Sequence, residues 1–241
     1  MGLFDIFGGG GPDKAVAKHR KRLIDPYRQS HERYLAMDEL AKLGTDAAVD
    51  ALLERFTIRV NGPTVDEEEK TYCYQLLASL GDPAVGPIVA FMQTHNSVYF
   101  PLRALRDIAG DDKAVDTLLA AIGDTDPGYH EGLERLREIV SNLRDFQHER
   151  VHQALVELLS SRSDEIRFYA LDGLASYPME DVAHLFAERL GDPNESQRVK
   201  GMACELAIEH DMVFKDCAAE VTLGLGEQYQ LNSEFRVVRR D

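Results

Sequence analysis

Two histidines four residues apart form the clearest chemical motif of the chain. His148, Glu149 and His152 match the pattern H-E-x-x-H, in which two imidazoles on one helix bind a zinc ion and the glutamate activates a zinc-bound water. The third ligand is missing from the local pattern, because no histidine follows before His184, and Leu155 stands where the metzincin motif has glycine. A zinc-dependent hydrolase that uses His148 and His152 is therefore the alternative function, and we expect no cofactor.

The cysteines are the next candidates for chemistry. Cys73, Cys204 and Cys217 include no C-x-x-C pair, so the sequence indicates neither a disulfide framework nor a thiolate metal site. Cys73 lies between Tyr72 and Tyr74 in an apolar helical segment, which favours packing over nucleophilic chemistry. Free thiols are typical of a reducing compartment, and we expect a cytoplasmic protein.

Composition narrows the classes of partner. The chain has 241 residues, 44% of them hydrophobic, and a formal net charge of −15. This apolar content is sufficient for a folded core. The acidic excess argues against nucleic-acid binding, which needs a dense cationic surface. No stretch approaches the ~18 consecutive apolar residues that would predict a transmembrane helix.

Charge is unevenly divided along the chain. Residues 1–33 carry a net charge of +3 and the remainder carries −18. Residues 1–25 combine an apolar start (Met1–Phe7), four glycines and a basic stretch at 14–22. We expect them to form a flexible arm that contacts a partner, an anionic membrane surface or the acidic body of the same molecule. The alternative is a solvated first helix.

From about residue 27 the sequence repeats itself, with an apolar helical run, a break and a second apolar run in each copy. The breaks at Gly44, Gly81 and Gly110 are spaced as in helical-hairpin repeats, at roughly 30 to 40 residues. Glycine can close a helix in the left-handed conformation, and the aspartate after it can cap the next helix. Proline after aspartate predicts further helix starts, at Pro26, Pro83, Pro127 and Pro193.

Each predicted helix has one apolar stripe. In the second helix of the first copy the stripe consists of Val49, Leu52, Leu53 and Phe56. Asp50, Glu54 and Arg55 are expected to face solvent. Strands should be absent or trivial. Because a single hairpin cannot bury its stripe alone, consecutive hairpins are expected to stack into a curved superhelix.

These segments resemble a known repeat family. Residues 34–53, 80–85 and 166–174 are similar to the HEAT repeat, particularly the bacterial subgroup also seen in bilin lyases, and the likeness covers about residues 27–215. The resemblance implies an all-α fold, a right-handed α-solenoid of about six helical hairpins. We place this solenoid at 26–228, followed by a C-terminal tail at 229–241 that is expected to be frayed. The family does not imply a reaction, since most of its members are binding scaffolds.

The resemblance also implies that the second helix of each hairpin lines the concave side of the solenoid. The polar positions of these helices are almost all acidic: Asp50, Glu54, Asp116, Glu149, Gln153, Glu157, Asp181, His184, Glu188, Asp216 and Glu220. An acidic concave face attracts cationic ligands. We therefore expect a non-catalytic protein-interaction scaffold or adaptor that binds a basic protein segment. The alternative is that these acids only keep the protein soluble.

Two HEAT-type enzymes fit less well. Deoxyhypusine hydroxylase uses His-Glu pairs, and this chain has such pairs at 31–32, 130–131 and 148–149, but in a different register relative to the helix ends. Alkylpurine DNA glycosylases need a cationic concave face, which an acidic body does not supply.

Overall fold

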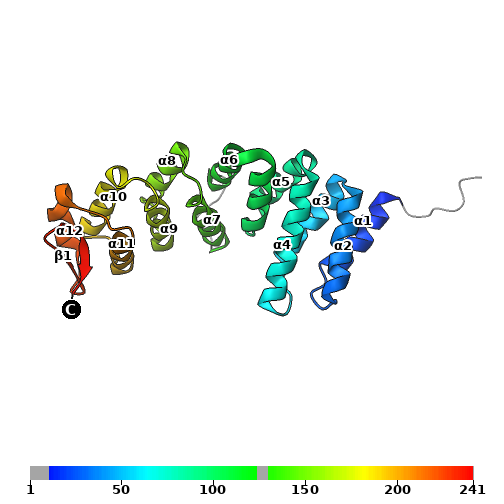
Figure 1. Ribbon diagram of the computed structural model, residues 1–241, viewed down its shortest axis with the longest axis horizontal. Helices are drawn as coiled ribbons and strands as arrows, with labels where there is room; N and C mark the ends of the chain where they lie inside the picture. Colours follow the sequence, from blue (N-terminus) through cyan, green and yellow to red (C-terminus); the bar gives the residue numbers. More distant parts are fainter. Residues whose placement is uncertain (1–10, 124–129, 241) are drawn as a thin grey trace, which may run out of the picture. The chain divides into compact units, whose positions relative to one another are not determined.

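The protein is all-α apart from one short hairpin of strands (Figure 1). The structure, a computed structural model, describes residues 11–123 and 130–240. The chain divides into two compact units, Met1–Asp124 and Thr125–Asp241.

Unit 1 contains three consecutive helix pairs preceded by one further helix. Its helices are α1 (Pro12–Leu23), α2 (Ser30–Leu43), α3 (Asp46–Leu53), α4 (Pro63–Leu80), α5 (Val85–Thr94) and α6 (Tyr99–Gly123), with 3₁₀ turns at Glu54–Thr57 and Asp82–Ala84. A φ of 81° at Gly110 divides α6 into two helical segments that form the third pair. Contacts run from α2 to α4 to α6 and from α3 to α5 to α6 (Figure 1). Two rows of helices result.

Unit 2 also contains three pairs. They are α7 (His130–Leu143) with α8 (Glu149–Leu158), α9 (Asp164–Leu174) with α10 (Met179–Gly191), and α11 (Gln197–Glu209) with α12 (Ala218–Gly224). A 3₁₀ turn at Lys215–Cys217 precedes α12. Helices α7, α9 and α11 contact one another in that order, and α10 packs on α12. This packing is so close that a Cβ at Gly224 would lie 1.7 Å from the carbonyl oxygen of Leu190, so only glycine fits there.

The glycine breaks are confirmed. Gly44, Gly81 and Gly110 all have positive φ, at 58°, 69° and 81°. The capping prediction is wrong in detail at the first break, because Thr45 is the N-cap of α3 and its hydroxyl accepts the Ala48 N–H. Asp46 lies one position further, in the first turn, where its charge still favours the positive helix end.

Of the three Asp-Pro junctions that the structure describes, one supports the proline prediction. Pro83 lies in the first turn of the 3₁₀ helix Asp82–Ala84 before α5, whereas Pro26 and Pro193 lie in turns that precede the next helix by several residues. Pro127 is outside the described residues. Helices α1 and α4 instead begin with prolines that do not follow an aspartate.

The predicted stripe of α3 is buried, and Asp50 is exposed as expected. Arg55, predicted to face solvent, is completely buried, which corrects the prediction. The helix ends at Leu53 and the chain continues as a 3₁₀ turn. With three residues per turn instead of 3.6, the face on which Arg55 lies rotates toward the interior.

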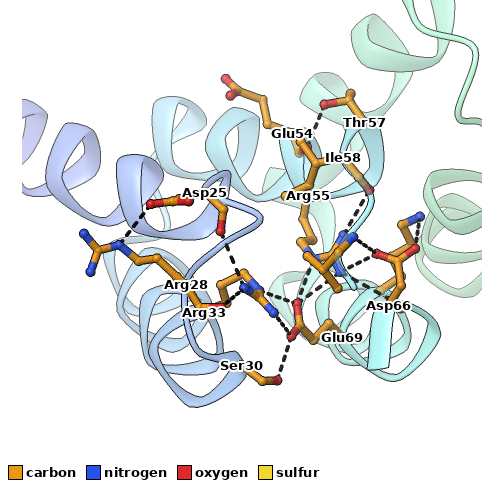
Figure 2. Close-up of polar contacts among 12 residues, drawn as sticks. Asp25, Arg28, Ser30, Arg33, Glu54, Arg55, Thr57, Ile58, Asp66 and Glu69 are labelled. Carbon is orange, nitrogen blue, oxygen red and sulfur yellow. Dashed lines mark hydrogen bonds and ion pairs between the residues drawn. The ribbon is translucent and has the colours of Figure 1, made fainter. Parts of the chain in front are cut away.

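Arg55 enters a buried cluster of charges that joins α2, α4 and the turn after α3 (Figure 2). Arg33 binds Glu69 through two parallel hydrogen bonds of 2.7 Å, and Ser30 Oγ donates to the same carboxylate at 2.6 Å. Arg55 Nε donates to the other oxygen of Glu69 at 3.1 Å. Arg33 and Glu69 are 3% and 0% exposed, so water does not screen this pair.

Asp66 completes the cluster on the far side of Arg55. Its carboxylate accepts from Arg55 Nη2 at 2.8 Å and from Lys70 Nζ at 2.7 Å. Burial opposes ionisation of Glu69, but the hydrogen bonds from Arg33 and Ser30 and the charges of the two arginines lower the pKa of Glu69. The pKa of Asp66 is lowered against burial by Lys70, Arg55 and the Val60 N–H.

The N-terminal arm differs from the prediction of a flexible 1–25 segment. Residues 12–23 form α1, in which Val16 and Leu23 are buried. This helix contacts both α2 and α3. Residues 1–10, and with them the predicted docking segment Met1–Phe7, lie outside the described residues.

The C-terminal tail is ordered, so the prediction of a frayed end is wrong. Strands β1 (Tyr229–Leu231) and β2 (Val237–Arg239) pair antiparallel, and β2 contacts α11. Val237 is buried, and Arg239 binds Glu205 of α11 at 2.6 Å. Apolar anchoring and an ion pair hold the hairpin to unit 2.

Among the residues described, no individual helix has both the length and the apolar character needed to cross a membrane. Helix α4 and the following segment Asp82–Thr94 pass this test only as a pair, bent by 115°.

We expect Glu69→Gln to destabilise unit 1 by about 3–5 kcal/mol, because it leaves buried Arg33 without a carboxylate and Arg55 with Asp66 alone. The matched control is Glu68→Gln, which makes the same change at an exposed neighbour and should alter stability by about 0.5 kcal/mol or less. Urea denaturation followed by circular dichroism measures both. Equal losses in the two variants would show that the cluster is not stabilising.

Stability should also depend on pH through this cluster. The folded pKa of Glu69 lies below its ordinary value of 4.5, so the unfolded state takes up protons first as the pH falls. The contribution of Glu69 is complete above pH 4.5 and is lost below it. Urea midpoints measured between about pH 6 and pH 3 should fall more steeply for the wild type than for Glu69→Gln. Parallel curves would contradict this assignment.

Candidate functional site

The predicted binding residues lie on the second helices of the pairs, or on their 3₁₀ extensions, and are exposed except for half-buried Glu54. Unit 1 holds Asp50 on α3, Glu54 in the turn after it, and Asp116 on the second segment of α6. Unit 2 holds Glu149, Gln153 and Glu157 on α8, Asp181, His184 and Glu188 on α10, Asp216 in the 3₁₀ turn, and Glu220 on α12. In each unit the predicted binding residues are therefore divided among different helices and turns.

Three acids follow one another along α3 and the turn that extends it. Asp46, Asp50 and Glu54 are spaced four residues apart, and we call them the α3 acidic stripe. Burial and the charges of Asp46 and Glu54 raise the pKa of Asp50. Crowded like charges of this kind are stabilised by a cation placed between them.

The basic helix α1 supplies one such cation. Arg20 Nε donates to Glu54 Oε1 at 2.7 Å, and α1 contacts α3. This hydrogen bond and the charge of Glu54 raise the pKa of Arg20. Within the described ranges Asp46 and Asp50 have no ion-pair partner, so part of the stripe stays open to a second cationic segment.

In unit 2 the fold brings together two predicted residues that are far apart in sequence. His184 of α10 and Asp216 of the 3₁₀ turn line one pocket of about 470 Å³, which we call the α10 pocket. Its other walls are apolar at Met179, Ala183 and Val213, and charged at Glu180 and Lys215. An aliphatic stem with a cationic end, as in lysine or arginine, matches this mixture of apolar wall and acidic rim.

Sequence patterns did not reveal the apolar half of this pocket. Met179 is the first residue of α10, and it is 38% exposed. Val213 is placed by an isolated β-bridge to Arg236, the residue directly before β2. Helical periodicity contains no information about a bridge between a loop and a tail.

Both histidines of the H-E-x-x-H motif contact neighbouring groups of the fold. His148 is the N-cap of α8, and its Nδ1 accepts the Arg150 N–H at 3.1 Å. The ring of His152 packs edge-on against Tyr177, with centroids 5.0 Å apart, and its Nε2 is buried without a hydrogen-bond partner. The hydroxyl of Tyr177 in turn donates to the carbonyl oxygens of Phe146 and His148.

Two carboxylates of unit 2, Glu165 and Glu180, are the acids that would have to supply a third ligand. Glu165 lies 3.8 Å from Arg137, and Glu180 lines the α10 pocket. Among the described residues, no group of three or more histidine, cysteine, aspartate or glutamate side chains is arranged to hold a metal ion. The side chains of the His-Glu pair at 130–131 lie outside the described residues, and in the pair at 31–32 Glu32 binds Arg28.

Comparisons with known proteins add no identity. No family model matches the chain, and no curated protein matches it. A solved structure described as an engineered protein is 18% identical and is matched over 86% of this chain, with a TM-score of 0.35. The match spans 60% of that protein's length. A likeness at this level carries no argument about fold or function.

The three thiols should differ in reactivity. Cys73 and Cys204 are buried, which raises the pKa of each to about 12. Cys217 is half-buried, and burial together with Glu220 and Asp216 raises its pKa to a lesser extent. We expect iodoacetamide to label Cys217 slowly in the native protein and to label the other two only after unfolding. Peptide mass spectrometry measures each site, and native labelling of Cys73 would contradict the burial.

Proposed function

We propose that this protein is a non-catalytic interaction scaffold or adaptor whose acidic second helices bind basic protein segments. The observation that carries the proposal is the hydrogen-bonded pair between Arg20 and Glu54, in which a basic helix of the chain lies against the α3 acidic stripe. A basic segment of another protein would use the same chemistry at Asp46 and Asp50 and in the α10 pocket.

The scaffold we propose is a right-handed, HEAT-like α-solenoid. Its support is the order of the helices: three pairs in each unit, with contacts between successive first helices. The repeated glycine breaks at positive φ also fit a tandem array of hairpins. Such arrays present long surfaces that suit extended or helical peptides.

The exposure of the acidic side chains determines the binding free energy that we expect. A single exposed ion pair contributes only about 0.2–1 kcal/mol. A basic segment would therefore need several contacts, and its binding should weaken steeply with salt. The apolar walls of the α10 pocket would add a salt-independent part, since lysine and arginine stems bury apolar surface.

We further propose a reducing, cytoplasmic location, which the three unpaired cysteines support. The proposed function needs no cofactor and no nucleic acid. Residues 1–11 and the exposed cations of α1 remain candidates for a contact with a partner or a membrane surface, as their composition predicts.

Binding of a lysine-rich helical peptide tests the proposal. Fluorescence anisotropy with the full chain should show affinity for this peptide and none for a glutamine-substituted peptide of equal length. Asp50→Lys should weaken binding about 3- to 10-fold, because it replaces attraction with repulsion on the α3 acidic stripe. Arg20→Ala should strengthen binding by a similar factor, since it frees Glu54.

The matched control is Glu67→Lys. It changes the net charge equally, but at an exposed position on α4, which is the first helix of its pair. It should leave the affinity within about twofold of the wild-type value. If Glu67→Lys and Asp50→Lys weakened binding equally, only net charge would matter and the second helices would not be the binding face.

A further inference from the structure

A buried cation recurs at one position of the first helices. Arg33 is the fourth residue of α2, and Arg167 is the fourth residue of α9. Three residues later each helix has a fully buried alanine, Ala36 or Ala170. The two arginines therefore occupy the same register on equivalent helices.

Both arginines bind a glutamate that lies later in the chain than their own helix, Glu69 in α4 or Glu195 in the loop before α11. Arg33 binds Glu69 as described above, and Arg167 binds Glu195 through two hydrogen bonds of 2.9 and 2.6 Å. In both cases Nη1 also donates to a carbonyl oxygen in the preceding loop, Arg28 or Ser161. Each arginine thus receives a buried carboxylate from a later segment.

Lys200 occupies this position in the last pair. It is the fourth residue of α11, followed three residues later by the buried Ala203. Arg33 and Arg167 each form an ion pair with a glutamate, whereas Lys200 lines a pocket beside the uncharged amide of Gln228.

The ammonium group of Lys200 has no counter-ion in the described part of the chain. Lys200 is only 8% exposed. Its side chain lines a pocket of about 380 Å³ together with Gln197, Gln228 and Tyr229, and with glycines that include Gly201 and Gly224. The side chain is mostly covered and its ammonium group forms no ion pair with the described residues, so an anion bound in the pocket would supply the missing counter-ion.

We propose that this pocket binds a carboxylate group, with Lys200 as its counter-ion and the side-chain amides of Gln197 and Gln228 as further donors. The glycine walls allow a ligand to approach closely. Glu227 also lines the pocket, and Glu205 is hydrogen-bonded to the Tyr229 hydroxyl at 2.6 Å. These negative neighbours disfavour a multiply charged phosphate and favour a singly charged carboxylate. The site lies between α11 and the C-terminal hairpin, touches the second helix α12 only at Gly224, and has the opposite charge preference.

The test uses the full chain labelled with ¹⁵N and the probe N-acetyl-glutamate α-amide, which carries one carboxylate. Titration should shift the amide resonances of Gly201, Gly224 and Gly226. The isosteric N-acetyl-glutamine α-amide should produce no shifts. Lys200→Met keeps the aliphatic stem and should weaken carboxylate binding at least about 10-fold, whereas Lys200→Arg should retain it. Lys215→Met, a lysine change in the α10 pocket of the same unit, should leave it unchanged.

Two further probes identify the source of the carboxylate. Tighter binding of a peptide with a central glutamate would assign the site to an acidic protein segment, and equal binding would assign it to a free small carboxylate. Equal shifts with the amide probe, stronger binding of inorganic phosphate, or full binding by a folded Lys200→Met variant would each overturn the proposal. A thermal melt confirms that the variants fold. Loss of basic-peptide binding by Asp50→Lys would be independent of every one of these outcomes.

Discussion

The buried carboxylate of Glu69, held between Arg33 and Arg55, is the interaction on which unit 1 depends. Ion pairs removed from water gain little net free energy, because desolvation offsets most of the attraction, but a misplaced partner costs several kcal/mol. The cluster therefore selects one arrangement of α2, α4 and the turn after α3. That selection also orients the α3 acidic stripe, because its last member, Glu54, is the first residue of the turn that carries Arg55 inward.

Arg33 and Arg167 show that the same constraint is used in both units. In each case a cation near the start of a first helix receives a carboxylate from a later segment, Glu69 of α4 or Glu195 of the loop before α11. At the same position of α11, Lys200 forms no such ion pair among the described residues. The C-terminal hairpin packs on α11 through β2 and the Arg239–Glu205 ion pair, and it places Gln228 and Tyr229 in the pocket that Lys200 lines.

The helix pairs could be predicted from sequence because their causes are local: glycine breaks and 3.6-residue stripes act within one or two turns. The outward position of the acids on second helices was predictable for the same reason. Arg55 was not, since its burial depends on a 3₁₀ turn and on carboxylates 11 and 14 residues away. The burial of Lys200 and the apolar wall of the α10 pocket could not be predicted from the sequence either. Their surroundings come from the C-terminal hairpin, whose short strands leave almost no periodic pattern to detect.

The division between inner and outer carboxylates explains how an acidic chain can hold its fold and still present charge. Glu69, Asp66 and Glu195 lie against arginines and add little to the external field. The acids predicted on the second helices are exposed, except for half-buried Glu54, so their negative charge is presented at the surface. Helix α1 has two roles at the first helix pair. Val16 and Leu23 bury apolar surface, and Arg20 neutralises Glu54. A concentration of basic residues in the first 33 positions is what a segment with this double role requires, and the same combination of apolar stem and cation is the chemistry expected of an external partner.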